Sequence, residues 1–422
     1  MKASAGSGRR AKILWVKAGG LVPPETGGRI RSYNIATRLA ERHDVGLFTF
    51  YGEQTPDPHV ELAAVFRPCV CLPLILPRAH APAEAARYAA SLLSLTPYQI
   101  TKFCTPVVRR TLAEVMLREA FDVVICDFVH AAGAIAWNSG PPKLVFTHNV
   151  EAQIWERHYR TSRNFAWKAV CWREWQLMQR YERRVLRRAD HIVAVSEPDR
   201  AAFSAFLDPA KITVTRTGVD LEYFRPGTRP IQQRKIVFMG SMDWLPNEDG
   251  IFYFLDAMFP RILEQMPDAQ LSIVGRKPSD RLRARAAGLP VHVLGRVEDV
   301  RPHMDDAAVC IVPLRIGGGT RLKIFEAMAM GLAVVSTSIG AEGLPVTHGE
   351  NVLLADAPEG FADAVVGCLR DSGLRSRMGA AARGFVEAEC GWGAVVDDFE
   401  GAIAAARGFA APQLAAMAGG GP

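Results

Sequence analysis

The sequence predicts an α/β protein in which two doubly wound parallel sheets form two domains of similar size. Three observations support this fold. A chain of 422 residues is long enough for roughly two to three domains. Short β-branched apolar runs alternate with amphipathic segments of helix length, as in parallel sheets covered by helices on both faces. The alternation stops once, at residues 225–230, where two prolines and a glycine stand among polar residues, and then resumes.

The interruption sets the expected domain boundaries. We predict an N-terminal Rossmann-like domain over residues 1–229, a C-terminal one over 230–410, and a flexible tail over 411–422, where no periodic apolar pattern continues. The strands expected in the first domain are 12–17, 45–51, 122–127, 143–147 and 191–196. Those expected in the second are 235–240, 270–275, 291–295, 309–313, 332–337 and 351–354.

Composition narrows the class of protein. The apolar fraction of 49% and the charged fraction of 22% are those of a globular chain. The first apolar run, 13–16, is too short for a signal peptide, and no stretch approaches the roughly 18 residues of a membrane span, so a soluble cytoplasmic protein is expected. The 8 cysteines are scattered; Cys69 and Cys71 are the only close pair, and without a C-x-x-C they indicate neither a zinc module nor a disulfide scaffold.

A glycine-rich loop follows the first expected strand and leads into a helix starting near Gly28. Its glycines, Gly27 among them, let a ligand approach the backbone, the helix N-terminus offers unpaired N–H groups, and Arg29 adds a positive charge. These features predict a phosphate-binding loop. The alternative is a plain flexible turn between strand and helix.

A second motif, residues 313–331, lies between two expected strands. Its opening residues are Gly317, Gly318, Gly319 and Thr320. Consecutive glycines allow backbone N–H groups to point at an anion, and Arg321 and Lys323 can neutralise a diphosphate. Glu326 lies about one and a half helical turns further, where its carboxylate can accept hydrogen bonds from two ribose hydroxyls. The alternative is a loop followed by a helix with a solvated charged face.

The segment 317–335 resembles the C-terminal donor-binding motif of family 4 glycosyltransferases. Residues 27–29 resemble the family's first glycine loop, 188–197 its strand before the linker, and 217–220 its N-G-V-D turn with Thr217 in place of asparagine. The resemblance extends from about residue 12 to about residue 400 and implies the GT-B fold, two Rossmann-like domains facing across a cleft. Within the family, the chain is most similar to bacterial sugar transferases of exosortase and exopolysaccharide loci.

The resemblance also implies roles for single residues. His148, which ends an expected strand, matches the family's histidine that reaches the donor sugar from the N-terminal domain. Gly240 follows the first strand of the second domain, in the family's donor-binding loop. Arg296 and Val297 stand where the family's backbone holds the nucleotide base.

Two departures from the family pattern shift the expected contacts. The family's two acids are spaced E-x7-E, and counting back from Glu326 reaches Gly318, so the acid that touches the donor sugar is missing. Residues 240–247 lack the family's basic pair, so Arg321 and Lys323 are expected to hold the diphosphate.

The segment 154–188 combines four tryptophans with many arginines. Trp167, Cys171, Met178, Tyr181 and Val185 fall at helical spacing. An apolar stripe beside a basic face is typical of a helix at an anionic membrane surface. A long helix that packs into the core and solvates its arginines fits equally and is more common.

The predicted function is transfer of a sugar from a nucleotide diphosphate donor to a glycan or lipid-linked acceptor, in the cytoplasm or on the inner face of the membrane. The family implies retention of configuration; no D-x-D triplet occurs, and no metal or other cofactor is expected. One alternative is a nucleotide-sugar epimerase on the same fold. Another is a non-catalytic sugar- or nucleic-acid-binding module; because the basic residues are dispersed, no nucleic-acid partner is expected despite the net charge of +6.

Overall fold

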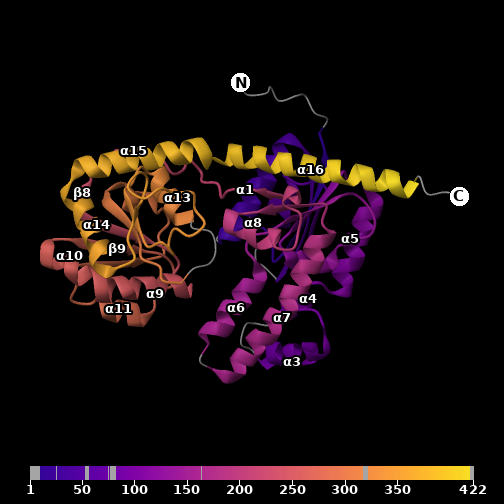
Figure 1. The fold of residues 1–422 in the computed structure, drawn as a ribbon, viewed down its shortest axis with the longest axis horizontal. Coiled ribbons are helices and arrows are strands. Elements are labelled where there is room, and N and C mark those ends of the chain that lie inside the picture. The colour runs from indigo at the N-terminus through magenta and orange to yellow at the C-terminus, as the bar shows by residue number, and fades with distance from the viewer. Residues whose placement is uncertain are drawn as a thin grey trace. The chain divides into compact units, whose positions relative to one another are not determined.

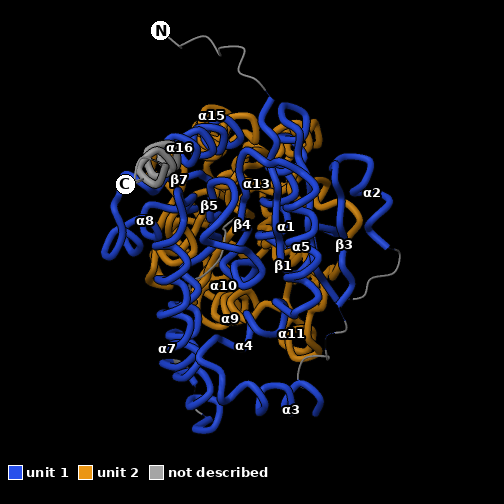
Figure 2. Tube along the Cα trace, turned by 90° about the vertical axis from the view of Figure 1, so that its right-hand side faces the viewer, with its two compact units in different colours: residues 1–216, 395–422 blue, residues 217–394 orange. Residues whose placement is uncertain are grey.

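The computed structural model describes residues 10–24, 26–52, 57–74, 76, 82–162, 164–316 and 322–418 (Figure 1). The chain divides into two compact units, residues 1–216 with 395–422 and residues 217–394 (Figure 2). We call them unit 1 and unit 2. Each contains one parallel sheet, as predicted, with helices packed against it.

Unit 1 contains a seven-stranded sheet in the order β3-β2-β1-β4-β5-β6-β7, with every neighbouring pair parallel. Its strands are β1 (Lys12–Ala18), β2 (Asp44–Gly52), β3 (Cys69–Leu74), β4 (Val123–Asp127), β5 (Lys143–Phe146), β6 (His191–Ala194) and β7 (Ile212–Val214). The chain proceeds from β1 outward to β3 and then returns to β4 on the other side of β1. This reversal opens a crevice at the carboxyl ends of β1 and β4, where α/β folds bind ligands.

The helical elements of unit 1 are α1 (Gly27–Arg42), α2 (His59–Ala63), α3 (Pro82–Ala90), η1 (Ser91–Leu93), α4 (Tyr98–Phe103), α5 (Pro106–Arg118), η2 (Val129–Ala134), α6 (Glu151–Thr161), α7 (Phe165–Arg188), α8 (Glu197–Ser204), η3 (Pro209–Lys211) and most of α16 (Trp392–Ala418). Local sequence explains several starts. The hydroxyl of Thr105 accepts from the backbone of Val108 and caps α5, and Ser196 caps α8 in the same way. Both helices also carry proline in their first turn, where its missing N–H costs nothing.

Helix α16 returns the end of the chain to unit 1. Phe399 is fully buried; its ring stacks on Trp15 at 5.7 Å between centroids and meets Phe146 edge-on at 5.1 Å. The sequence predicted a C-terminal domain to residue 410 and a tail from 411, whereas α16 continues to Ala418. Alanine, leucine, methionine and glutamine are strong helix formers, which explains a helix without a periodic apolar pattern.

Unit 2 contains a six-stranded sheet in the order β10-β9-β8-β11-β12-β13. Its strands are β8 (Gln232–Met239), β9 (Gln270–Val274), β10 (Val291–Gly295), β11 (Ala307–Val312), β12 (Val334–Ser336) and β13 (Leu353–Leu354). Its helices are α9 (Leu245–Tyr253), the π-helical η4 (Phe254–Met258), α10 (Phe259–Gln265), α11 (Asp280–Ala286), α12 (Arg301–Asp305), α13 (Leu322–Ala329), α14 (Pro358–Arg370) and α15 (Ser372–Glu389). Buried apolar side chains fill both faces of this sheet, as the uniformly apolar strands require.

The boundary between the units also differs from the sequence prediction. The division falls at residues 216 and 217 instead of 229 and 230, so the proline-rich stretch 225–230 belongs to unit 2. Gly227 is packed there so closely that an added Cβ would lie 2.2 Å from the Asp305 carboxyl carbon. The stretch is therefore a packed part of unit 2.

Among the described helices, none combines the length and apolar character needed to cross a membrane.

Candidate active site

A buried cluster of charged side chains lies at the carboxyl ends of β1 and β4 in unit 1. Lys17 ends the apolar run of β1, and Asp127 faces it across the β1–β4 pair, with Lys17 Nζ 3.0 Å from Asp127 Oδ2. Lys17 also donates to the Ser32 hydroxyl of α1 at 3.0 Å. The indole N–H of Trp15 donates to Asp127 at 2.9 Å. Lys17 and Asp127 are almost completely buried, so their contacts with each other replace hydrogen bonds to water.

His148 is the third member of this cluster. Its Nε2 lies 2.8 Å from Asp127 Oδ1, and its Nδ1 lies 3.5 Å from an Arg31 nitrogen. Burial lowers the pKa of His148 to about 3, although Asp127 opposes the shift. Burial alone would raise the pKa of Asp127, but Lys17 and His148 hold it well below its usual range. At neutral pH the ring is therefore neutral, with Nε2–H donating to an ionised carboxylate.

Phe128, directly after β4, covers this cluster. Its ring lies parallel to the His148 ring, with centroids 3.8 Å apart and planes 7° apart, and Lys17 Nζ lies 4.7 Å from its centre. Its backbone adopts φ 65°, a conformation that costs a bulky residue about 1–3 kcal/mol. The ring also explains Gly28, because a Cβ there would lie 2.8 Å from Phe128 Cζ. Gly28 thus lets helix α1 start against an aromatic ring.

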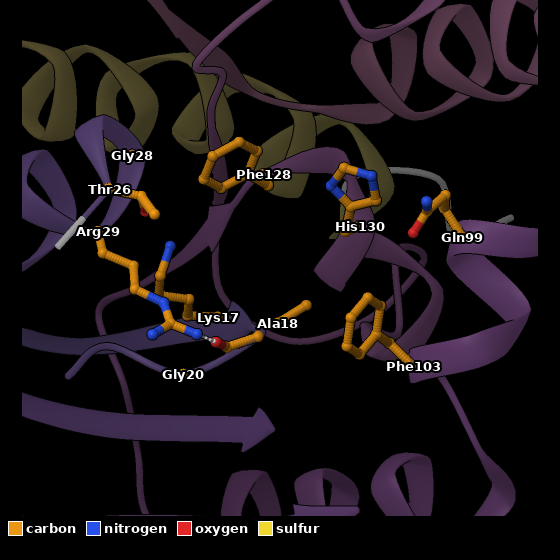
Figure 3. A pocket seen from close by; sticks show the side chains of 11 residues that line it. Lys17, Ala18, Gly20, Thr26, Gly28, Arg29, Gln99, Phe103, Phe128 and His130 are labelled. Atoms are coloured by element: carbon orange, nitrogen blue, oxygen red, sulfur yellow. Dashed lines mark hydrogen bonds between the residues drawn. The ribbon is translucent and has the colours of Figure 1, made fainter. Parts of the chain in front are cut away.

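A cavity of about 250 Å³ opens beside Phe128 (Figure 3). Its lining residues are Lys17, Ala18, Gly19, Gly20, Thr26, Gly28, Arg29, Gln99, Phe103, Phe128 and His130. Figure 3 shows the two cations on one side of the cavity and Phe103, Gln99 and His130 on the other. Arg29 donates to the Gly19 carbonyl oxygen at 2.6 Å, which fixes its guanidinium at the loop.

Of the residues predicted in this unit, Gly28 and Arg29 line the cavity. Gly27 is the first residue of α1, so the helix begins one residue earlier than expected, and it is not among the lining residues. His148 is 3% exposed and does not line the cavity, whereas Lys17 of the same cluster and Phe128, whose ring stacks on His148, both do. Sequence reasoning missed Lys17, Asp127 and Phe128.

In unit 2, two glycines bring the ends of β8 and β9 together. A Cβ on Gly275 would lie 1.8 Å from the Gly240 carbonyl oxygen, and a Cβ on Gly240 would lie 2.7 Å from Lys323 Nζ. Lys323, on α13, donates to Asn247 Oδ1 at 2.5 Å, and its Nζ lies 4.5 Å from the centre of the Phe238 ring. The predicted residues Gly240 and Lys323 therefore meet at one corner.

Two cations that the sequence prediction missed also reach this corner. Arg276 and Lys277 follow Gly275, the first residue after β9; Arg276 Nε donates to the Ser241 hydroxyl at 2.7 Å, and Lys277 Nζ lies 3.2 Å from Asp243. The strand order places them beside the cation-free loop 240–247. The sequence did contain a signal for these two cations, because a glycine and two basic residues follow an apolar strand.

The structure describes three of the other residues predicted in unit 2 and leaves five outside its described range. Glu326, on α13, is half-buried, and burial raises its pKa to about 7 although Lys323 opposes the shift. After β10, Arg296 is exposed and Val297 packs against the core. The predicted residues Gly317, Gly318, Gly319, Thr320 and Arg321 lie outside the described residues.

Comparison with known proteins agrees with this architecture. Residues 26–223 match the family model for glycosyltransferase family 4, and residues 233–371 match that for group 1 glycosyl transferases. An uncharacterised 44.6 kDa protein of the Klebsiella pneumoniae cps region is 23% identical over 84% of this chain and 90% of its own. Phosphatidyl-myo-inositol mannosyltransferase of Mycobacterium tuberculosis is 33% identical over 39% of this chain and 46% of its own.

Solved structures share the fold. Sucrose-phosphate synthase of Thermosynechococcus elongatus superimposes with a TM-score of 0.70 at 18% identity, covering 97% of this chain and 100% of that one. HepE of Anabaena, solved with UDP and glucose, superimposes with a TM-score of 0.66 at 15% identity, covering 94% and 100%. The two family matches, together with the two Rossmann-like sheets, identify the class as GT-B glycosyltransferase. The chain belongs to this class, with a family 4 domain followed by a group 1 domain.

Proposed function

We propose that the protein transfers a sugar from a nucleoside diphosphate donor to a glycan or lipid-linked acceptor in cell-surface polysaccharide synthesis. The observation that carries the proposal is the corner of unit 2 where Gly240, Lys323 and Arg276 meet, because close backbone and cations together suit a diphosphate. The cps-region relative and the UDP complex of HepE support the substrate class. Arg321 and the backbone of 317–320 are assigned to the same diphosphate.

The proposed mechanism stabilises the leaving group. As the bond between the anomeric carbon and the diphosphate oxygen breaks, negative charge grows on the diphosphate, and positioned cations stabilise that charge more than the ground state. The acceptor oxygen attacks from the same face, its proton passes to the leaving diphosphate, and configuration is retained. The proposal assigns no metal. We assign His148 a positioning role, since its neutral ring supports Phe128 at the cavity of unit 1.

A donor assay separates the three functions. Purified protein is incubated with a panel of nucleoside diphosphate sugars, with and without a lipid or glycan acceptor, and both nucleotide release and sugar products are measured. A transferase needs the acceptor for efficient release. An epimerase converts the donor sugar without acceptor, and a binding module releases no nucleotide; either outcome would replace the proposal.

Glu326 provides a specific test of ribose recognition. Glu326→Gln keeps the shape but removes one charge-assisted hydrogen bond, worth about 1.5–3 kcal/mol, so KM for the donor should rise roughly ten- to a hundredfold. Since the pKa of Glu326 is about 7, donor affinity of the wild type should increase as pH rises through that value, while the variant stays flat. A nucleotide lacking the ribose hydroxyls should bind both proteins alike. If the variant still prefers intact ribose as strongly as the wild type, Glu326 does not read it.

An exposed apolar surface on unit 1 supports a membrane-bound acceptor. We define it as the apolar end: Leu92, Leu93, Leu95, Phe165, Trp167 and Trp172. Leu93 is 97% and Phe165 89% exposed. Arg173 of α7 donates to the Ser91 carbonyl at 2.8 Å and joins the two segments, which Figures 1 and 2 show together at the α3 end of unit 1. Large exposed apolar groups on one surface are typical of membrane or partner contacts.

The rest of the predicted stripe belongs to the core. Cys171, Met178 and Val185 are buried, as the core-helix alternative predicted, whereas Trp167 is 46% exposed. Helix α7 therefore has an exposed apolar first part, on which the membrane proposal rests, and a buried later part that belongs to the core. Its first turns lie in the apolar end, with the exposed cations Arg157 and Arg160 of α6 nearby in sequence, and its later turns pack under the sheet.

Vesicle sedimentation tests the membrane proposal. The double variant Leu93→Ser/Phe165→Ser should bind anionic vesicles about tenfold or more weakly than wild type, because burying such side chains contributes about 1.5–3 kcal/mol each. Wild-type binding should weaken with added salt. The matched control, Ile231→Ser/Leu294→Ser, removes exposed apolar side chains of unit 2 and should bind like wild type. Wild-type protein that stays in the supernatant at low salt would refute membrane contact.

A further inference from the structure

Three side chains of metal-binding type meet at the edge of the unit 1 sheet. Cys69 and Cys71 lie two positions apart on β3, so their side chains project from one face of the strand. His59 is the first residue of α2, the helix that connects β2 to β3. One ligand atom from each residue lies within 4.8 Å of the other two. The chain connection β2–α2–β3 brings together residues that are ten or more positions apart.

The distances match a tetrahedral centre. The two sulfur atoms are 3.8 Å apart. In a tetrahedron with metal–sulfur bonds of about 2.3 Å, as for Zn²⁺, the sulfurs are separated by about 3.8 Å. A disulfide needs sulfurs about 2.05 Å apart, so the present spacing is far too long for that bond. Both cysteines are half-buried and His59 is exposed, which leaves an open path for an ion from solvent.

We propose that Cys69, Cys71 and His59 bind one thiophilic cation, Zn²⁺, with water as the fourth ligand. Binding converts two thiols to thiolates, releases two protons and leaves the imidazole neutral, so the ion and its ligands carry no net charge. The metal fastens α2 to the edge strand β3. None of the three residues lines the cavity of unit 1, so the role is structural and separate from sugar transfer.

This site was not predicted from sequence. The absence of a C-x-x-C argued against a zinc module, and a C-x-C on a strand does not reveal a third ligand. Parallel pairing places Cys69 beside Leu47 and Cys71 beside Thr49, on the face of the sheet that α2 covers. The histidine reaches the cysteines only because α2 packs against that face.

Metal titration tests the proposal. Full-length protein is reduced, stripped with chelator and titrated with Zn²⁺ by calorimetry, then with Co²⁺ to detect thiolate-to-metal charge transfer. We expect one equivalent bound, two protons released per ion, and a higher Tm with metal. Cys69→Ser and Cys71→Ser should each weaken binding at least about a hundredfold and remove the charge-transfer band, and His59→Gln about tenfold or more.

The control is His292→Gln, which changes an exposed histidine of unit 2 and should bind as wild type does. Circular dichroism of each metal-free variant separates lost ligands from lost folding. The proposal is overturned if the reduced wild type binds no stoichiometric Zn²⁺, or if both serine variants bind as tightly as wild type. A Cys69–Cys71 disulfide in the purified protein, with no binding after reduction, would identify a redox pair instead. None of these outcomes depends on the donor assay.

Discussion

The double variant Arg321→Ala/Lys323→Ala is expected to lose donor binding while keeping its fold. Each cation contributes a charge-assisted hydrogen bond worth about 1.5–3 kcal/mol, so losing both should weaken nucleotide binding by roughly a hundred- to ten-thousandfold. Calorimetry with the best nucleoside diphosphate measures the change. Because Lys323 also holds Asn247, thermal unfolding should be followed in parallel.

The matched control removes two other positively charged side chains of unit 2, both of them arginines. Arg234 and Arg261 are each about 40% exposed and form surface ion pairs, so Arg234→Ala/Arg261→Ala changes the net charge equally without touching the Gly240 corner. Equal weakening in both double variants would mean that only long-range charge matters. Unchanged affinity in Arg321→Ala/Lys323→Ala would remove the diphosphate assignment.

Replacing Asp127 by alanine is expected to destabilise unit 1 by about 3–5 kcal/mol, because it leaves the buried ammonium group of Lys17 without its counter-ion. The double variant Lys17→Met/Asp127→Ala should recover most of this loss, since an apolar replacement of a buried ion pair is often neutral. Urea unfolding measures both. Asp268→Ala, at an exposed ion pair, is the control and should cost at most about 1 kcal/mol.

Activity adds a second measurement to the same variants. If the pair positions Phe128 at the cavity, the double variant should fold but transfer sugar more slowly than wild type. The buried-pair interpretation fails if Asp127→Ala unfolds at the same urea concentration as wild type, or if adding Lys17→Met deepens the loss.

The sequence predicted all six strands of the second sheet and the five inner strands of the first, but not the two edge strands of the first sheet. β3 contains Pro73, which cannot donate to a sheet ladder and lowers strand propensity, and β7 has only three residues. Edge strands tolerate both features, so their patterns are weak. The boundary at 225–230 misled because proline and glycine also occur in packed segments.

The sequence analysis could propose site residues from single stretches of chain, and these remain predictions; it could not propose contacts that depend on strand order. Lys17 and Asp127 each end an apolar run, but only the β1–β4 neighbourhood turns them into a pair. The same holds for Arg276, whose partner Ser241 follows a different strand. His148 was found by its position, while its neutral state and its place behind Phe128 required the packing around it.

The return of α16 to unit 1 determines which unit can complete its folding first during synthesis. Unit 2 is continuous in the chain and can form as soon as its last residue leaves the ribosome, whereas unit 1 lacks the ring of Phe399 until all of unit 2 has been made. Until then Trp15 and Phe146 lack a core neighbour, and an apolar surface of the first sheet stays uncovered. The core of unit 1 can therefore be completed only after unit 2 has been synthesised, and a chain truncated between residues 394 and 399 would lack a core side chain of the unit that is translated first.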